Sequence, residues 1–347
     1  MKKVLAWLLA FLLLGGAAAL GEAEETPIPI RVLLLPKFEV GELSGDFPGE
    51  AQYYYEAYLA GGEAYEVPGA GTLYVKDGVA LCLTGMGKVN AAITTAAVLT
   101  DRRFDFSAAY VISTGCAGSA MGTTVMGDVF VISEAVDYDL GHRVDSRELK
   151  DPEGTTWFRD PSFDDAAVVR LDPALTEAVY ALVRDVPLET TERTRAFMAA
   201  AFDGAAWAVR DPRVLRGTTV TGDNYWKGIH GHNSAAQIVE SYGCADPYAL
   251  TEMEDVAVGR TLQRLGMADR YIIIRDSVNI DVFMAGETPE HLWGPDSGDQ
   301  LSSEESVESA DIFETARKNN FAVGSAVIDA ILRGELGTPD PALRPGT

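Results

Sequence analysis

The chain has 347 residues, and its 28 basic side chains stand against 52 acidic ones, which gives a formal net charge of −24. The composition is typical of a globular protein and excludes a disordered, collagen-like or repetitive chain. The negative charge argues against nucleic acid and anionic membranes as partners, because both would be repelled, but it leaves a neutral small molecule open.

The start of the chain is typical of a secretory signal peptide. Two lysines precede the unbroken apolar run Val4–Leu14, and small residues follow it. The run is shorter than the ~20 residues of a membrane-spanning helix, and no later apolar stretch is long enough either. We therefore expect a signal peptide at residues 1–19, a linker at 20–29, and a secreted or periplasmic protein that does not span a membrane.

Short apolar runs alternate with helix-like stretches in the rest of the chain. The apolar runs predict strands, in chain order, at Ile30–Leu35, Val79–Leu83, Ala109–Ser113, Val129–Ser133, Val214–Val220 and Tyr271–Ile274. The predicted helices are Lys88–Thr100, Asp172–Arg184, Arg193–Ala201, Asn233–Tyr242, Thr251–Leu265 and Glu304–Leu332. This alternation predicts an α/β domain with a largely parallel sheet over residues 30–335, followed by a flexible tail at 336–347.

Polar and small residues follow several of these strands, at the ends where ligands bind in such sheets. Glu39 comes after the first strand and is a candidate general base, although a lone loop glutamate is more often solvated. Gly115 lies in the small-residue crossing Thr114–Gly118, which lets the backbone approach a ligand. The glycine loop Gly85–Asn90 matches neither a P-loop nor a dinucleotide-binding motif.

Aromatic and acidic residues follow two later strands. Tyr225 and Trp226 are adjacent and offer a flat face for a heterocycle, with core packing as the equal alternative. Glu254 lies beside Met253 near the start of a predicted helix. A glutamate there is either solvated at the helix start or points inward to bind sugar hydroxyls.

Taken in order, these segments resemble a known group of proteins. The stretches are GMGKV, STGCAG, GDVFVISEAVDYD, TGDNYW, EMED and RDSVNID. The ordered set is similar to the nucleoside phosphorylase/hydrolase superfamily and, within it, to the purine nucleoside permease family. The resemblance covers residues 30–335 and implies a three-layer α/β/α fold around a central mixed, partly barrel-like sheet.

The resemblance also implies roles for single residues. In the methylthioadenosine nucleosidase branch an early glutamate activates water, and Glu39 matches it by position. Tyr225 corresponds to the aromatic residue that stacks on the purine, and Trp226 corresponds to the residue that meets the base through its backbone. Met253 and Glu254 correspond to the pair that binds the ribose 2′ and 3′ hydroxyls.

Two departures from the superfamily pattern bear on the reaction. Superfamily members carry an acid that contacts purine N7, and this chain has Asn279 at that position. Asn279 cannot protonate N7, but it can accept a hydrogen bond from a protonated N7 and donate one to a 6-oxo group. Asp281 is a rival for the acid role, because on a strand it faces the same side as Asn279. The arginine-bearing phosphate loop of the phosphorylases is absent, which favours water as the acceptor, while Lys37 leaves phosphate open.

We therefore expect an exported purine nucleosidase that hydrolyses the N-ribosidic bond, with Glu39, Asn279 and Asp281 as catalytic residues. Inosine or guanosine is favoured as substrate, and adenosine is a further candidate. Two alternatives stay open. One is a non-catalytic nucleoside-capture component of purine nucleoside uptake, and the other is a phosphate-dependent purine nucleoside phosphorylase.

No cofactor and no metal are expected. His230 and His232 have a spacing that can bind a transition metal, but shaping a loop is the commoner role for such a pair. The acidic stretch Asp137–Asp139 is too sparse for a calcium site. The three cysteines leave at least one thiol unpaired in a monomer. Members of the superfamily usually form dimers, trimers or hexamers, so we expect a homo-oligomer.

Overall fold

The computed structural model describes residues 26–151, 154–284, 287–289 and 303–339. The expected signal peptide at 1–19 lies outside the described residues, as do most of the expected linker and most of the tail. Across the described ranges, no helix has both the length and the apolar stretch that a bilayer crossing requires.

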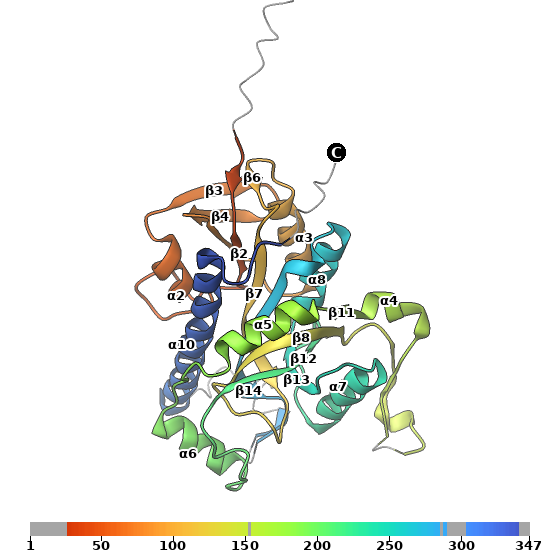
Figure 1. Ribbon diagram of the computed structural model, residues 1–347. Coiled ribbons are helices and arrows are strands. Elements are labelled where there is room, and N and C mark those ends of the chain that lie inside the picture. The colour runs from red at the N-terminus through yellow and green to blue at the C-terminus, as the bar shows by residue number, and fades with distance from the viewer. Residues whose placement is uncertain (1–25, 152–153, 285–286, 290–302, 340–347) are drawn as a thin grey trace, which may run out of the picture.

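A ten-stranded mixed sheet forms the centre of the molecule (Figure 1). Its strands are β2 (Val32–Leu35), β3 (Glu63–Val67), β4 (Gly71–Lys76), β5 (Val79–Cys82), β7 (Tyr110–Ser119), β8 (Val129–Asp137), β11 (Val168–Arg170), β12 (Val214–Thr221), β13 (Tyr248–Glu252) and β14 (Tyr271–Ile280). Two short pairs complete the set, β1 (Ile28–Pro29) with β6 (Phe104–Asp105) and β9 (His142–Arg143) with β10 (Trp157–Phe158).

Part of the sheet closes on itself. The strands follow the order β11-β8-β12-β13-β7-β2-β5-β4-β3, and β14 pairs with both β7 and β8. β14 is hydrogen-bonded to both end strands of the row β8-β12-β13-β7, parallel to β7 and antiparallel to β8, so it joins the two ends of this row. The result is a closed ring of five strands, which confirms the expected mixed, partly barrel-like sheet.

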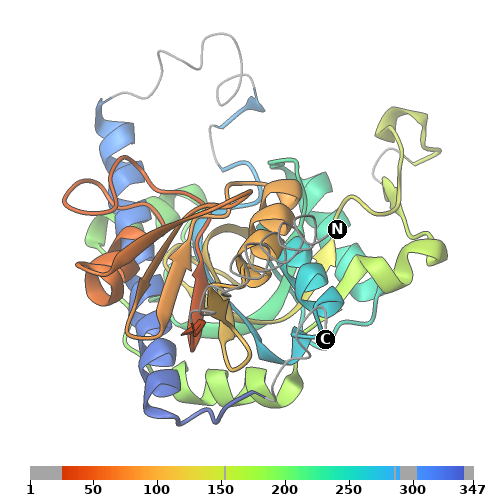
Figure 2. The same ribbon diagram turned by 90° about the horizontal axis from the view of Figure 1, so that it is seen from above.

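Helices cover both faces of the sheet. They are α2 (Gln52–Tyr54), α3 (Lys88–Leu99), α4 (Asp164–Ala167), α5 (Pro173–Val183), α6 (Glu192–Ala201), α7 (Ile229–Ser241), α8 (Asp255–Arg264) and α10 (Ser303–Arg333). In β2, Leu33 and Leu35 pack into a core with α3 and α8, while Val32 and Leu34 pack into the opposite core with α5 and α10. Figure 2 shows α10 (blue) and α8 (cyan) on opposite sides of the strands. The expected three-layer α/β/α arrangement is therefore confirmed.

Two predicted helices are wrong at their starts, and one of them is the helix predicted at Asn233–Tyr242, which already begins at Ile229 as α7. The predicted helix Thr251–Leu265 begins only at Asp255, and its first two residues belong to strand β13. The physical reason is tertiary pairing, because β13 lies parallel to β12 on one side and antiparallel to β7 on the other. As a result, Glu252 lies at the end of β13, beside Arg275 of the candidate site.

Candidate functional site

The middle of β7 is where the candidate residues converge. Its neighbours β2 and β14 are both parallel to it. β2 ends beside Ser113, whereas β7 and β14 continue together to Ser119 and Ile280. A Cβ at Gly115, whose φ is +147°, would lie 2.4 Å from the Glu50 carboxylate. A Cβ at Gly118 would lie 2.1 Å from Asp281 Oδ1 and 3.0 Å from Asn279 Nδ2. Glycine is thus required at both positions, which lie about 10 Å apart along β7 and which we call the floor of the site.

Glu50, which lies outside the residues that the sequence pattern singled out, occupies one end of this floor. Its side chain is buried, and its Oε2 accepts the backbone N–H of Lys37 at 2.7 Å. Its Oε1 accepts the backbone N–H of Cys116 at 2.8 Å and the thiol of the same residue at 3.1 Å. Burial and the Glu50 carboxylate raise the pKa of this thiol to about 12, so it remains a donor. These contacts fix the carboxylate against Gly115.

Glu39 lies earlier in the same loop and binds the start of α2. Its Oε2 accepts the backbone N–H groups of Ala51 at 2.9 Å and Gln52 at 2.7 Å. Its Oε1 accepts those of Val40 at 2.9 Å and of Gly49. A carboxylate is stabilised where unpaired amides begin a helix. The geometry therefore gives Glu39 four backbone contacts that close the loop, and it places Glu50 at the strand.

A buried ion network surrounds Arg275, on β14. Its Nε and Nη2 donate to the Asp255 carboxylate at 3.0 and 2.8 Å. The same Nη2 lies 3.1 Å from Glu254 Oε2 and 3.3 Å from Glu252 Oε2. Burial and the Asp255 carboxylate raise the pKa of Glu252 to about 7, whereas Arg275 holds the pKa of Asp255 below its ordinary value against the effect of burial. The three carboxyl groups therefore depend on Arg275 for most of their charge compensation.

Glu254 links this network to the start of α3. Its Oε1 accepts the backbone N–H of Gly87 at 3.0 Å, and Asp223 Oδ1 accepts the next N–H, from Lys88, at 2.8 Å. Met253 is half-buried beside Glu254. The first amides of a helix can bind a free anion. In α3 these amides are already bound to carboxylates.

Asn279 and Asp281 meet at the other end of the floor, on the same side of β14. Asn279 Nδ2 lies 3.4 Å from Asp281 Oδ1. Asp281 is 2% exposed, and its Oδ2 accepts the hydroxyl of Tyr248 at 2.5 Å and the hydroxyl of Thr251. Burial raises the pKa of Asp281 to about 7, although these hydrogen bonds oppose the rise. Asp281 therefore takes up a proton at a much higher pH than an exposed aspartate does.

Tyr225 and Trp226 have different surroundings. The Trp226 ring stacks on Tyr138, with centroids 5.2 Å apart and planes at 16°, inside an apolar cluster with α7. The Tyr225 side chain is largely exposed. Partial removal of its hydroxyl from water, and next the Asp281 carboxylate, raise the pKa of Tyr225 to about 12. Tyr225 therefore lies within electrostatic range of Asp281.

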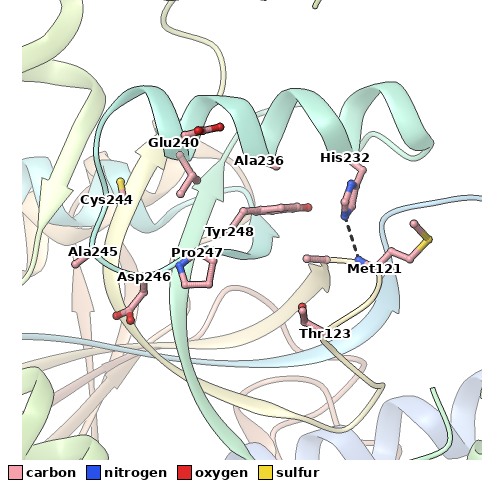
Figure 3. Close-up of a pocket in the computed structure, with 12 residues that line it drawn as sticks. Met121, Thr123, His232, Ala236, Glu240, Cys244, Ala245, Asp246, Pro247 and Tyr248 are labelled. Carbon is pink, nitrogen blue, oxygen red and sulfur yellow. Dashed lines mark hydrogen bonds between the residues drawn. The ribbon is translucent and has the colours of Figure 1, made fainter. Parts of the chain in front are cut away.

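A separate hollow of about 470 Å³ lies between α7 and β13 (Figure 3). Its lining is mostly apolar, and the Tyr248 ring forms part of its wall. On α7, His232 Nε2 accepts the backbone N–H of Met121 at 3.2 Å, so this histidine ties the helix to the loop after β7. Within the part of the chain that the structure describes, no group of His, Cys, Asp or Glu is arranged to hold a metal ion. All three cysteines fall in that part and are free thiols.

We expect Asp281→Asn to stabilise the protein at alkaline pH. Because burial raises the pKa of Asp281 from its ordinary value of 3.8 to about 7, the folded state holds this proton more tightly than the unfolded state does. The free energy of unfolding of the natural protein therefore falls as the pH rises from about 4 to about 7, and a neutral amide removes that loss. Urea unfolding at about pH 5 and about pH 8 should show a gain that is ~2–3 kcal/mol larger at the higher pH. An equal effect at both pH values would contradict the assigned environment.

Comparison with known proteins gives a family match over most of the chain. The sequence profile of the family described as "Purine nucleoside permease (NUP)" matches residues 29–335. A Schizosaccharomyces pombe protein named "Probable purine nucleoside permease" is 28% identical over 221 residues, which are 57% of this chain and 63% of the yeast protein. The 5′-methylthioadenosine/S-adenosylhomocysteine nucleosidase of Mycobacterium bovis is 31% identical over 148 residues, 42% of this chain and 51% of that protein. The chain thus spans between half and two thirds of the length of these relatives.

Solved structures share the fold. The 5′-methylthioadenosine/S-adenosylhomocysteine nucleosidase of Neisseria meningitidis, crystallised with methylthio-immucillin-A, superposes with a TM-score of 0.51 at 19% identity. The superposition covers 86% of this chain and 99% of the nucleosidase. At this identity the likeness concerns the arrangement of helices and strands.

Proposed function

The chain belongs to the purine nucleoside permease family, and from this premise we propose that it binds purine nucleosides and cleaves their N-ribosidic bond with water. The observation that carries the proposal is the floor between Gly115 and Gly118, which has Glu50 at one end and Asn279 and Asp281 at the other. The two glycines lie about 10 Å apart along β7, a length that matches a water molecule, the glycosidic bond and the N7 edge of a purine placed in line. The nucleosidase relatives support cleavage as the reaction.

At the Glu50 end the carboxylate orients a water molecule beneath C1′ of the ribose. It takes a proton from this water while the bond to the base breaks. The sugar passes through a state that resembles an oxocarbenium ion, which a fixed negative charge stabilises. Glu254 binds the ribose hydroxyls, because its oxygens bond to Gly87 and Arg275 and each retains a lone pair for a hydroxyl. Met253 packs beside the sugar.

At the other end the purine lies against Tyr225 and borders the backbone of Trp226. Its N7 edge faces Asn279, and Asp281 stabilises the leaving base through its contact with Asn279. The base gains a proton at N7 from solvent, and Glu50 returns to solvent the proton that it takes from the attacking water, so the two transfers balance. The products are therefore a neutral purine and free ribose.

Three features favour water over phosphate as the acceptor. The first amides of α3 are bound to Glu254 and Asp223. The ammonium of Lys37 is buried and donates to Leu35 O at 2.5 Å and to Ser113 Oγ at 2.6 Å. The carboxylates around the floor also repel a second anion.

A nucleoside-capture protein without catalysis is the second candidate, and the family description favours it. Asn279 is consistent with capture, because an amide cannot protonate N7. Capture gives the Glu50 carboxylate no role in chemistry, although two backbone amides fix it where the sugar is expected. For this reason we place cleavage first.

Product analysis with purified protein tests the proposal. Incubation with inosine, and separately with adenosine, should release free base and ribose in equal amounts, with no dependence on added phosphate. Ribose 1-phosphate that forms only with phosphate would indicate phosphorolysis. Intact nucleoside that stays bound would indicate capture. Either of these outcomes contradicts hydrolysis.

We expect Tyr225→Ala to weaken nucleoside binding by ~1–3 kcal/mol, because the stacking face is lost. Tyr225→Phe is the matched control, since it keeps the ring and removes only the hydroxyl. Its affinity should stay within about threefold of that of the natural protein. Titration calorimetry with a slowly cleaved nucleoside measures both. If the two variants lose equal affinity, the ring is not the stacking surface.

We further propose that residues 1–19 direct export and are then removed, and that the mature protein is a homo-oligomer. The basic start, the apolar run and the small residues after it support export.

A further inference from the structure

We propose that Asp281 is a positioning residue that sets the orientation of the Asn279 carboxamide, so that protonation of Asp281 switches the site from 6-aminopurines to 6-oxopurines. The proposal rests on the function proposed above, because it takes Asn279 as the residue that faces the base.

The two oxygens of Asp281 have different neighbours. Oδ2 accepts the hydroxyls of Tyr248 and Thr251, both on β13. Oδ1 faces Asn279 Nδ2 at 3.4 Å and lies over Gly118, where the absence of a side chain leaves space for it. Because Oδ2 already meets two donors, a proton that binds to this carboxyl group resides on Oδ1. The titrating proton therefore points toward Asn279.

The charge of Asp281 then determines which end of the amide faces the ligand. When Asp281 is ionised, Oδ1 accepts a hydrogen bond from Asn279 Nδ2, and Asn279 Oδ1 is turned to the base. That oxygen can accept hydrogen bonds from a 6-amino group and from N7–H. When Asp281 is protonated, it donates to Asn279 Oδ1, and the amide turns its Nδ2 to the base. This donor matches a 6-oxo group and repels a 6-amino group.

The surroundings bring this switch into the physiological range. Burial raises the pKa of Asp281 to about 7, while Thr251, Tyr248 and Lys227 act in the opposite direction. Several titratable or charged groups face Asp281 from the elements around it. Tyr248 lies on β13, Tyr138 follows β8, and Tyr225 lies in the loop before α7. Lys227 lies in the same loop and pairs with Glu287, and His232 lies on α7 with its ring edge-on to Tyr248. Of these, His232 is a second ionisable group, and burial lowers its pKa from the ordinary value of 6.5, so the experiment must separate its titration from that of Asp281.

Binding of free adenine and free hypoxanthine at two pH values tests the proposal. Free bases need no catalysis, so a protein that binds them without cleaving nucleosides would refute hydrolysis and still test this inference. We expect the adenine-to-hypoxanthine affinity ratio to fall by about tenfold or more between about pH 8.5 and about pH 5.5.

Asp281→Asn is the decisive variant, because an amide imitates the protonated acid. Its oxygen accepts the two hydroxyls on β13, and its NH₂ group faces Asn279 as a permanent donor. The variant should prefer hypoxanthine at both pH values, with no change in the ratio. Asp211→Asn removes an exposed carboxyl and should keep the pH dependence of the natural protein.

A ratio that is independent of pH in the natural protein overturns the proposal, even if the variant fails to fold. An unchanged pH dependence in Asp281→Asn also overturns it and assigns the effect to His232 or to the bases. Binding of neither base overturns both this inference and the proposed base site.

Discussion

Replacement of Glu50 by Gln should lower the turnover of purine nucleosides by about 10²–10⁴-fold while nucleosides still bind. Gln has nearly the shape of Glu but cannot accept a proton from water, and it adds no charge to the oxocarbenium-like sugar. Its NH₂ group would face the backbone N–H of Lys37 or of Cys116, so we expect a lower thermal stability as well. Steady-state kinetics with inosine and adenosine, together with binding of the intact nucleoside to the variant, separate the loss in kcat from any change in affinity.

Glu39→Gln is the matched control, because Glu39 is the carboxylate that the sequence favours. Its four backbone contacts predict a lower thermal stability, since an amide NH₂ group would face backbone donors, and a turnover close to that of the natural protein. If Glu39→Gln loses the activity and Glu50→Gln retains it, the assignment from sequence position is right and the assignment from geometry is wrong.

Replacement of Arg275 by Met should destabilise the protein by ~3–5 kcal/mol at about pH 8, because it leaves Glu252, Glu254 and Asp255 buried without their guanidinium. The cost should shrink below about pH 7, where Glu252 takes up a proton in the folded state. Urea unfolding at about pH 8 and at a pH below about 7 measures how the free-energy cost of the Arg275→Met substitution changes with pH.

Arg103→Met provides the comparison for a surface ion pair. Arg103 pairs with Asp101 at the surface and donates to Glu66 O, and exposed pairs of this kind contribute little to stability. If Arg275→Met costs no more than Arg103→Met, the network around Arg275 does not hold the site together. If it costs the expected amount, nucleoside affinity should fall as well, because Arg275 orients Glu254.

The strands were predictable where the sequence has a continuous run of apolar residues. β2, β5 and β12 coincide closely with predicted strands, and the layers follow from burial on both faces. The sequence did not show that β7, β8 and β14 continue past their apolar cores, because their later residues are small or polar and form strand only by pairing with distant segments. For the same reason Thr251 and Glu252 were assigned to a helix rather than to β13.

The candidate site was predictable in part. The spacing of two residues on a strand predicts that Asn279 and Asp281 share a side, and the structure brings them within 3.4 Å. Glu50 gave a weaker signal, because it precedes a short aromatic helix rather than following a strand. Its partner Cys116 is 66 positions away in the sequence, so only the folded loop brings this carboxylate to Gly115. Contacts of this kind have no local pattern from which to read them.

A crystal structure with a non-cleavable adenosine analogue bound is the most direct test of the account. We expect the purine against Tyr225 with N7 toward Asn279, the ribose hydroxyls within hydrogen-bond distance of Glu254, and a water molecule between Glu50 and C1′. An analogue seated in the hollow between α7 and β13, or a sugar turned away from Glu50, would contradict it.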